Sequence, residues 1–239
     1  MNYRRLLLKL SGEALAGGGD FGIREEVLSH VVSEIAAVLD ADVQVGLVIG
    51  GGNIFRGKEM AAGNMDRVAA DHMGMLATCM NALALENAFK QAGMGAKIFS
   101  GLAIPGVVED FDFRESRDCL ENGSVAIFSA GTGNPYFTTD TAAVLRALEV
   151  QADCVIKGTR VDGVYSADPE KDSSAQKYDV LSYSAVLANN LGVMDATAIA
   201  LCRENSLPLH VYNMTEKGAL LALARREQAG TLVNDTGSV

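Results

Sequence analysis

Residues 43–57 read Val43-Gln44-Val45-Gly46-Leu47-Val48-Ile49-Gly50-Gly51-Gly52-Asn53-Ile54-Phe55-Arg56-Gly57, and this segment sets the interpretation of the chain. The apolar run at its start is typical of a parallel strand buried on both faces. The three glycines that follow leave backbone N–H groups uncovered, so an anion such as phosphate can approach closely. Arg56 follows within reach and can bind phosphate oxygens. Taken alone, the segment is equally compatible with an ordinary tight turn.

Outside this segment, short apolar runs alternate with longer amphipathic stretches. The predicted strands are residues 6–10, 43–49, 96–100, 125–129, 154–157 and 209–212, and the predicted helices are residues 24–39, 68–91, 138–150, 195–205 and 217–227. This alternation predicts an α/β fold with a mostly parallel sheet and helices on both faces. Residues 160–179 are the least regular part and predict a long functional loop or a small hairpin.

Composition narrows the class of protein. A chain of 239 residues with 49% hydrophobic content can bury one sizeable core. A net charge of −10 argues against broad binding to nucleic acid or anionic membranes. No stretch approaches the roughly 20 apolar residues of a membrane span, and residues 1–5 lead into a strand rather than a signal peptide. The four separated cysteines predict reduced, buried thiols in a cytoplasmic protein, and the three histidines lack metal-ligand spacing, so we expect no metal site built by the chain.

Ligands of open α/β sheets bind at the carboxyl ends of the strands, so the loops after the strands are the candidate site. The first strand ends in Lys9-Leu10-Ser11-Gly12, where the lysine can reach phosphate; taken alone, Lys9 is more simply an ordinary strand-end lysine. The loop at residues 129–140 is rich in donors, carries aromatic residues that can stack on a flat base, and opens a helix. Residues 157–169 supply a second strand-end lysine and Tyr165, a candidate adenine contact.

Two further features have alternative explanations. Asp71, near the start of the helix after the glycine loop, can accept hydrogen bonds from ribose hydroxyls or can simply favour the helix dipole. Residues 17–22 match G-x-G-x-x-G formally, but the second strand ends in glycines and not in an acidic residue, so a flexible loop is the simpler interpretation. The chain contains no G-x-x-x-x-G-K-[S/T] segment, which excludes a P-loop enzyme.

Five motifs occur in one order along the chain: Lys9-Leu10-Ser11-Gly12, Gly50-Gly51-Gly52-Asn53, Asp71-His72-Met73-Gly74-Met75, Gly131-Thr132-Gly133-Asn134-Pro135 and Val161-Asp162-Gly163-Val164-Tyr165. Together they resemble the amino-acid kinase family over essentially the whole length. Residues 71–78 and 131–140 closely resemble its bacterial branch that phosphorylates UMP. The resemblance implies one αβα sandwich with a mainly parallel central sheet, in which roughly residues 1–150 bind the phosphate acceptor and residues 151–239 bind ATP.

The resemblance also implies the reaction ATP + UMP → ADP + UDP, with Mg²⁺, in pyrimidine nucleotide biosynthesis. The implied catalytic residues are Lys9, Arg56 and Asp140, with Asp140 holding the catalytic lysines in place. The implied ATP-binding residues are Lys9, Leu10, Ser11, Gly12, Gly52, Arg56, Thr159, Tyr165 and Asp168. The implied UMP-binding residues are Gly51, Asp71, Thr132, Gly133, Asn134, Pro135, Tyr136, Phe137, Thr138 and Thr139.

Members of this branch are typically homohexamers that GTP activates and UTP inhibits. The resemblance places the GTP-responsive region near Gly17, Gly18, Gly19, Asp20, Phe21 and Gly22. Glycines there would leave the loop mobile until a ligand or a neighbouring subunit orders it.

Two other functions compete with this interpretation. The first is a carboxylate or carbamate kinase with the same fold; Asp71 and the loop at residues 131–140 argue against it, because a small acid has no ribose or base to contact. The second is a non-catalytic nucleotide or oxyanion binder. The presence of Lys9 and Asp140 argues against that protein class.

Overall fold

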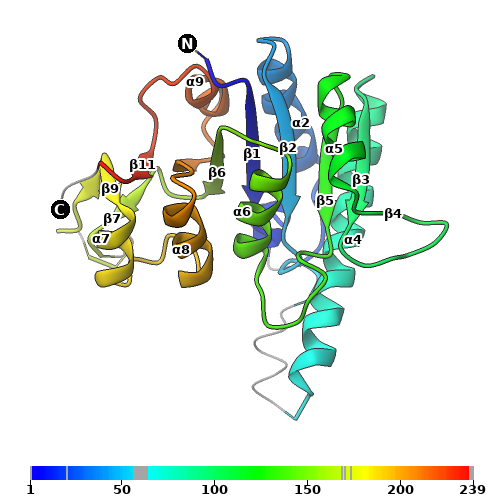
Figure 1. The fold of residues 1–239 in the computed structure, drawn as a ribbon, viewed down its shortest axis with the longest axis horizontal. Coiled ribbons are helices and arrows are strands. Elements are labelled where there is room, and N and C mark those ends of the chain that lie inside the picture. Colours follow the sequence, from blue (N-terminus) through cyan, green and yellow to red (C-terminus); the bar gives the residue numbers. More distant parts are fainter. Residues whose placement is uncertain are drawn as a thin grey trace.

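The computed structural model describes residues 2–19, 21–55, 64–167, 169, 171–172 and 174–236. The strands of its central sheet are β1 (Arg5–Leu10), β2 (Gln44–Ile49), β3 (Ala96–Ser100), β4 (Glu109–Asp110), β5 (Val125–Ser129), β6 (Cys154–Thr159), β9 (Val180–Ser182), β10 (Leu209–Asn213) and β11 (Thr231–Asn234). The helices are α1 (Gly12–Leu15), α2 (Glu25–Leu39), α4 (Arg67–Gln91), α5 (Phe113–Glu121), α6 (Thr139–Glu149), α7 (Tyr183–Ala188), α8 (Ala196–Glu204) and α9 (Ala219–Ala224) (Figure 1).

The sheet has the strand order β4-β3-β5-β2-β1-β6-β10-β11-β9. Among the described strands it is parallel throughout, except that β10 and β11 pair antiparallel. Strands β7 (Val164–Tyr165) and β8 (Lys177–Tyr178) form a separate antiparallel hairpin. The predicted fold class, a mainly parallel sheet between two helical layers, is confirmed.

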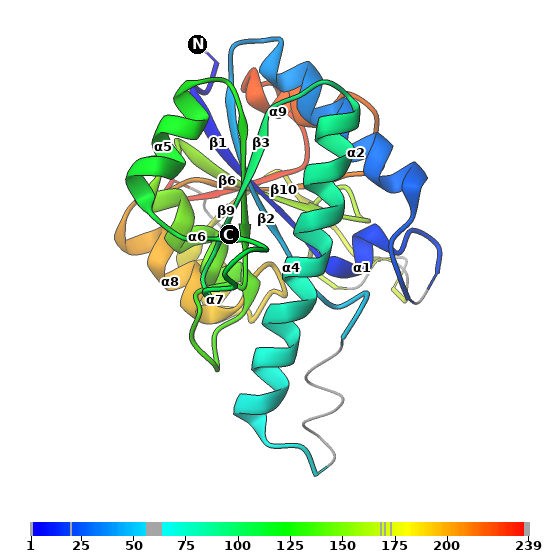
Figure 2. The same ribbon diagram turned by 90° about the vertical axis from the view of Figure 1, so that its right-hand side faces the viewer.

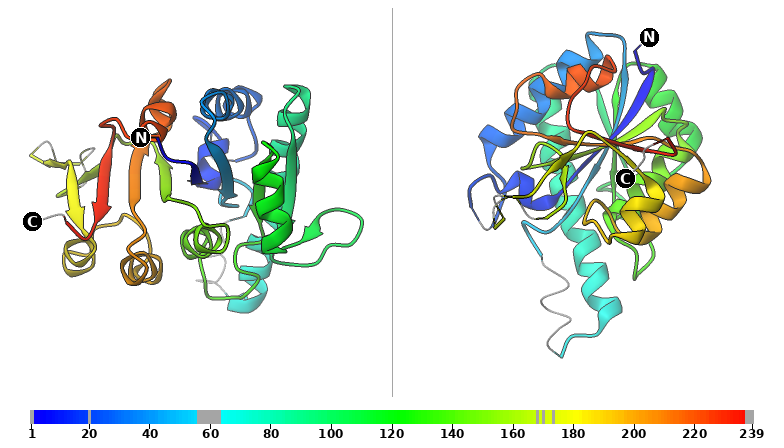
Figure 3. Two further views of the ribbon diagram at one scale, coloured as in Figure 1. Left: turned by 45° about the horizontal axis from the view of Figure 1, so that its top comes forward. Right: turned by 90° about the vertical axis from the view of Figure 1, so that its left-hand side faces the viewer.

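Two helical layers cover the sheet. Helices α2, α4 and α9 pack on one face and α5, α6, α7 and α8 on the other, as the edge-on view shows (Figure 2). Figure 3 shows the same layers from two further sides. Because β1 has helices on both faces, all six of its residues are buried, which explains its four leucines, and the charged Arg5 and Lys9 are buried with them. Leu6, Leu8 and Leu10 face the first layer, whereas Leu7 and Lys9 face the second.

Side chains cap the start of most helices. In five helices a side-chain oxygen of the N-cap residue accepts a hydrogen bond from a backbone N–H of the first turn. These N-cap residues are Asp66 (α4), Asp112 (α5), Thr138 (α6), Ser182 (α7) and Asp195 (α8). The apolar residues of α2, among them Val31, Val32, Ile35 and Val38, face the core. The apolar face of this helix is therefore used within the subunit.

The six predicted strands and five predicted helices are present, with one large boundary error. The helix predicted over residues 217–227 spans only Ala219–Ala224, because Gly218 and Arg226 adopt left-handed φ values of 82° and 59°. The hairpin β7–β8 confirms a small hairpin within residues 160–179. All four cysteines are free thiols, but Cys119 is only half-buried, unlike the other three. Within the described residues, no helix combines the length and apolar character needed to cross a bilayer.

Candidate active site

Two lysines and one aspartate meet at the carboxyl edge of the sheet. The register of β1 against β6 places Lys9 directly opposite Lys157, so both side chains emerge on the face covered by α6. Asp140, in the first turn of α6, lies between them. Lys9 Nζ is 2.7 Å from Asp140 Oδ1, and Lys157 Nζ is 3.0 Å from Oδ2. Neighbouring like charges in a buried setting need a counter-charge, and Asp140 provides it.

The ionisation of this cluster follows from its burial and its charges. Burial alone would raise the pKa of Asp140, but the charges of Lys9 and Lys157 outweigh burial and lower it. Burial lowers the pKa of Lys157, opposed by the charge of Asp140. The carboxylate thus stays ionised, and it faces both lysines.

The glycine loop packs backbone against backbone. The Gly50 N–H donates to the Leu10 carbonyl at 2.9 Å, which fixes the start of the loop to the end of β1. A Cβ at Gly51 would lie 2.8 Å from the Gly74 carbonyl oxygen of α4, and a Cβ at Gly12 would collide with the Gly52 amide nitrogen. Side chains at these positions would push the loop away from its neighbours, so the glycines are required for this close approach.

A buried pair of amide side chains anchors the same loop. Asn53 and Asn81 donate to each other's oxygens at 3.0 and 2.7 Å. The second N–H of Asn81 donates to the Gly50 carbonyl, and that of Asn53 to the Gly22 carbonyl. All four amide hydrogens therefore have partners, and the pair ties the glycine loop to α4 and to residue 22.

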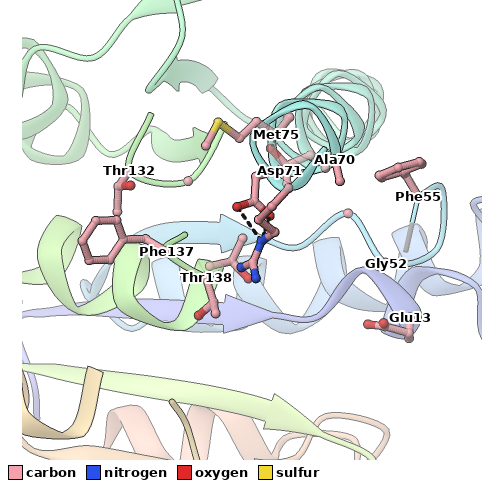
Figure 4. A pocket seen from close by; sticks show the side chains of 15 residues that line it. Glu13, Gly52, Phe55, Ala70, Asp71, Met75, Thr132, Phe137 and Thr138 are labelled. Carbon is pink, nitrogen blue, oxygen red and sulfur yellow. Dashed lines mark hydrogen bonds and ion pairs between the residues drawn. The ribbon is translucent and has the colours of Figure 1, made fainter. Parts of the chain in front are cut away.

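A cavity of about 500 Å³ lies between α4, the glycine loop and the loop after β5 (Figure 4). Of the residues expected to bind the acceptor, it is lined by Gly51, Asp71, Thr132, Phe137, Thr138 and Thr139, and also by Gly52. Gly133, Asn134, Pro135 and Tyr136 do not line it. Sequence reasoning missed Glu13, Phe55, Arg67, Ala70, Gly74, Met75 and Thr78 as lining residues. Several of these repeat at three- and four-residue spacing on α4, and this helical periodicity was a usable signal.

The loop after β5 is held in a left-handed backbone conformation at several points. Ala130, Gly131, Gly133 and Tyr136 have φ values of 55°, 58°, 76° and 74°. Contacts from α4 anchor both ends of the loop: the Ala130 N–H donates to Thr78 Oγ1 at 2.6 Å, and the Tyr136 N–H donates to Asp71 Oδ2 at 2.7 Å. The loop is therefore shaped by α4, which also contributes six of the residues that line the cavity.

Thr138, which lines this cavity, also contacts the C-terminal half of the chain. Its side chain accepts the Asp140 N–H at 3.0 Å and caps α6. It also donates to Asp195, the cap of α8, which accepts from Thr141 Oγ1 at 3.0 Å as well. The start of α6, which carries Asp140, is thus fixed from the α8 side.

A second cavity, of about 580 Å³, lies beside Lys157. Lys157, Thr159 and Tyr165 line it, together with residues from the α7–α8 connection such as Asn189 and Gly192. Both cavities have volumes within the range of roughly 300–1,000 Å³ that is usual for small-molecule sites. Lys9, Leu10, Ser11, Gly12 and Asp140 line neither cavity, while Asp20, Arg56 and Asp168 lie outside the described residues.

The model of the amino acid kinase family matches residues 4–213. The chain belongs to the amino acid kinase family. It is 53% identical over 234 residues to the uridylate kinase of Stutzerimonas stutzeri strain A1501, covering 98% of this chain and 95% of that relative. It is 54% identical over 231 residues to the uridylate kinase of Alcanivorax borkumensis, covering 97% and 92%.

Solved structures of the amino acid kinase family agree with the sequence comparison. The crystal structure of UMP kinase from Bacillus anthracis matches with a TM-score of 0.96 at 36% identity, over 100% of this chain and 99% of that one. The predicted resemblance to bacterial UMP kinases is therefore confirmed over nearly the full length of the chain.

Proposed function

We propose that this enzyme transfers the γ-phosphoryl group of ATP to UMP and releases ADP and UDP, in pyrimidine nucleotide biosynthesis. The observation that carries the proposal is the buried Lys9–Asp140–Lys157 cluster, with one cavity of nucleotide size at Lys157 and another at Thr139, the residue before Asp140. The similarity to relatives named uridylate kinase supports UMP as the acceptor.

UMP is assigned to the first cavity. Asp71 offers a carboxylate to ribose hydroxyls, Phe137 offers a flat ring to the base, and the amides of Gly51 and Gly52 offer donors to the phosphate. The segment from Thr132 to Thr139 would enclose the base and the phosphate, with Gly133, Asn134, Pro135 and Tyr136 shaping the loop.

ATP is assigned to the second cavity, beside Lys157, Thr159 and Tyr165. The end of β1 at Leu10, Ser11 and Gly12 would face the transferring group from the other side. Arg56 and Asp168, outside the described residues, stay proposed phosphate and ATP contacts. In this proposal, residues 1–150 bind the acceptor and residues 151–239 bind ATP within one domain. A single sheet in which β1 pairs with both β2 and β6 is consistent with that division.

Phosphoryl transfer requires that the two nucleotides be held in line and that positive charge lie near the transferring group. An oxygen of the UMP phosphate attacks the γ-phosphorus, the bond to the β–γ bridging oxygen breaks, and ADP leaves in line. Lys9 and Lys157 stabilise the charge on the transferring oxygens. Asp140 orients the lysines and does not serve as a base, since its lowered pKa makes it a poor proton acceptor. No base is needed, because a phosphate monoester with a second pKa of about 6 is largely ionised at neutral pH.

Mg²⁺ would accompany ATP and neutralise phosphate charge. Among the described residues, no cluster of three or more His, Cys, Asp or Glu side chains could enclose a metal ion. In nucleotide sites Mg²⁺ is usually held by phosphate oxygens and water, with one or two carboxylates.

Assembly and regulation are part of the proposal. Met73, Leu76, Met80 and Leu83 are 36–54% exposed along one stripe of α4, which supports a homohexamer in which neighbouring subunits cover them. For GTP activation, hydrogen bonds between Gly22 and Asn53 connect the loop at Gly17, Gly18, Gly19, Phe21 and Gly22 with the glycine loop. Inhibition by UTP and a cytoplasmic location complete the proposal; the four free thiols are consistent with a reducing compartment.

The deciding experiment is an ADP-release assay with a panel of acceptors. We expect turnover with UMP, with clear preference over CMP and dUMP, and none with glutamate, aspartate or carbamate. Turnover confined to the small acids would contradict the proposal. ATP and UMP binding without turnover would favour the non-catalytic binder.

A further inference from the structure

The carboxylate of Asp71 already has two hydrogen-bond donors in this structure. Arg67, one turn earlier on α4, places Nε 2.9 Å from both Oδ1 and Oδ2 of Asp71, and the Tyr136 N–H donates to Oδ2 at 2.7 Å. The ion pair is the dashed line at Asp71 in Figure 4. Both Arg67 and Asp71 line the acceptor cavity.

Arg67 also contacts the loop after β5. Its guanidinium carbon lies 5.2 Å from the centre of the Tyr136 ring, within cation–π range. Tyr136 is 67% exposed and has a φ of 74°, a backbone conformation that needs support from its surroundings. Arg67, Asp71 and Tyr136 thus form a closed set of contacts between α4 and the loop, which we call the Arg67 clamp.

We propose that Arg67 is a positioning and specificity-determining residue for the acceptor, which it serves by fixing Asp71 and Tyr136. This inference rests on the proposed function, because it assigns Asp71 to the ribose. A carboxylate accepts about four hydrogen bonds. The Arg67 Nε–H is shared between both oxygens and the Tyr136 N–H binds Oδ2, which makes three contacts and leaves Oδ1 able to accept from a ribose hydroxyl. Holding the carboxylate in place before the ligand arrives removes an ordering cost from binding.

The effect of Arg67 on acceptor binding can be measured separately from effects on folding stability and on the rate of phosphoryl transfer. The Arg67 side chain is 43% exposed, and exposed ion pairs four residues apart on a helix stabilise proteins little. The lysine cluster has its own partners in β1, β6 and α6. Removal of Arg67 should therefore leave the fold and kcat largely intact and weaken the binding of the acceptor.

The test combines Arg67→Gln, Arg67→Lys, Asp71→Asn and the double variant Arg67→Gln/Asp71→Asn. For Arg67→Gln we expect the KM for UMP to rise roughly fivefold, which at 1.4 kcal/mol per tenfold is about 1 kcal/mol. We expect the KM for dUMP to change less than twofold, so that the preference for UMP falls. Arg67→Lys should retain part of the preference for UMP, since lysine keeps the positive charge but lacks the planar guanidinium group.

The matched control is Arg114→Gln. Arg114 likewise pairs with an aspartate, Asp112 at 3.0 Å, and lies over a ring, Phe113 at 5.4 Å, but it is remote from both cavities. The Arg114→Gln variant should leave the KM values for UMP and dUMP unchanged. In the Asp71→Asn background, Arg67→Gln should add less than a twofold effect, because the group that it positions is already altered.

Three results have distinct meanings. An unchanged UMP/dUMP ratio in Arg67→Gln, in a wild-type background that turns over UMP, would overturn the role of Arg67 and leave the kinase assignment intact. Equal losses for UMP and dUMP with a lowered Tm would show a merely structural role and would also overturn it. Failure of the wild-type protein to use UMP at all would instead overturn the proposed function on which the inference rests.

Discussion

Lys9 illustrates how a residue's role depends on what the fold places around it. Only 5% of the residue is exposed, yet it is charged and lies opposite a second lysine. Burying such a charged side chain costs free energy unless an ion-pair partner compensates for the lost hydration. Its position at the end of a predicted strand, within a recognisable motif, made it predictable from sequence, as were Asp71 and Asp140. Arg67 and Asn81 were not, because their contacts depend on which face of α4 meets the loops.

Lys9→Met should lower kcat roughly 10²–10³-fold, since a cation at the transferring group stabilises the transition state more than the ground state. The KM for UMP should change much less. Steady-state kinetics check this, with the exposed Lys90→Met as the control. Circular dichroism and Tm must show a folded variant, because Asp140 loses one of its two partners. A folded Lys9→Met enzyme with near-normal kcat would remove Lys9 from the mechanism.

His210 predicts an acid-dependent loss of stability. Burial, assisted by the charge of Arg226, lowers the pKa of His210 from 6.5 to about 4. Between these pH values the unfolded chain binds a proton that the folded chain does not, so the free energy of unfolding falls as the pH falls, by at most about 3 kcal/mol. Urea unfolding at a series of pH values from 7.5 to 4.5 measures this decrease in the free energy of unfolding. His210→Gln should show a shallower slope; equal slopes in the wild-type and His210→Gln proteins would contradict the assignment.

At the scale of elements, α4 does more than cover the sheet. It lines the acceptor cavity, anchors the loop after β5 through Thr78 and Asp71, and holds the glycine loop through Asn81.

The long strands were predictable from sequence because strands buried on both faces contain runs of mostly apolar residues. Strands β4, β7, β8 and β9 are two or three residues long, too short for a period to be visible. Helix α5 is mostly polar, with Ser116 and Leu120 its buried residues.

Asn81→Asp tests the link between α4 and the glycine loop. The carboxylate keeps the shape of the amide but cannot donate to the Gly50 carbonyl or to Asn53. Buried groups left without partners cost about 1–3 kcal/mol, so the free energy of unfolding should fall by at least that amount, and kcat/KM should fall with it as the loop loses its anchor. Denaturant unfolding and kinetics measure both. Asn87→Asp, exposed on the same helix, is the control; a wild-type unfolding curve for Asn81→Asp would refute the link.

At the scale of the whole molecule, strand order is the part that sequence could not supply. The sheet extends outward from β1 through β2, β5, β3 and β4 on one side and through β6, β10, β11 and β9 on the other. Which strands become neighbours depends on pairings far apart in sequence, whereas the alternation of elements only restricts the class of fold. The two cavities and the lysine cluster all follow from this order, because it brings β1 and β6 together.

The apolar stripe on α4 predicts the assembly. The N-terminal part of α4 extends beyond the sheet (Figures 1 and 2), with Leu76 49% and Met80 54% exposed. Replacing both with glutamate should dissociate the proposed hexamer, because charges in a buried apolar interface are strongly unfavourable. Sedimentation velocity measures the change, with Val107→Glu, an exposed apolar residue outside α4, as the control. A stable and fully active wild-type monomer would contradict the assembly.

The fate of the γ-phosphate tests the central claim most directly. The enzyme is incubated with ATP labelled in the γ-phosphate, with Mg²⁺ and UMP, and the products are separated by chromatography. We predict that the label appears in the β-phosphate of UDP, in amounts equal to the ADP formed, and that Lys9→Met slows its appearance. Label that appears only in inorganic phosphate, or in an acyl phosphate when a small acid replaces UMP, would contradict the account.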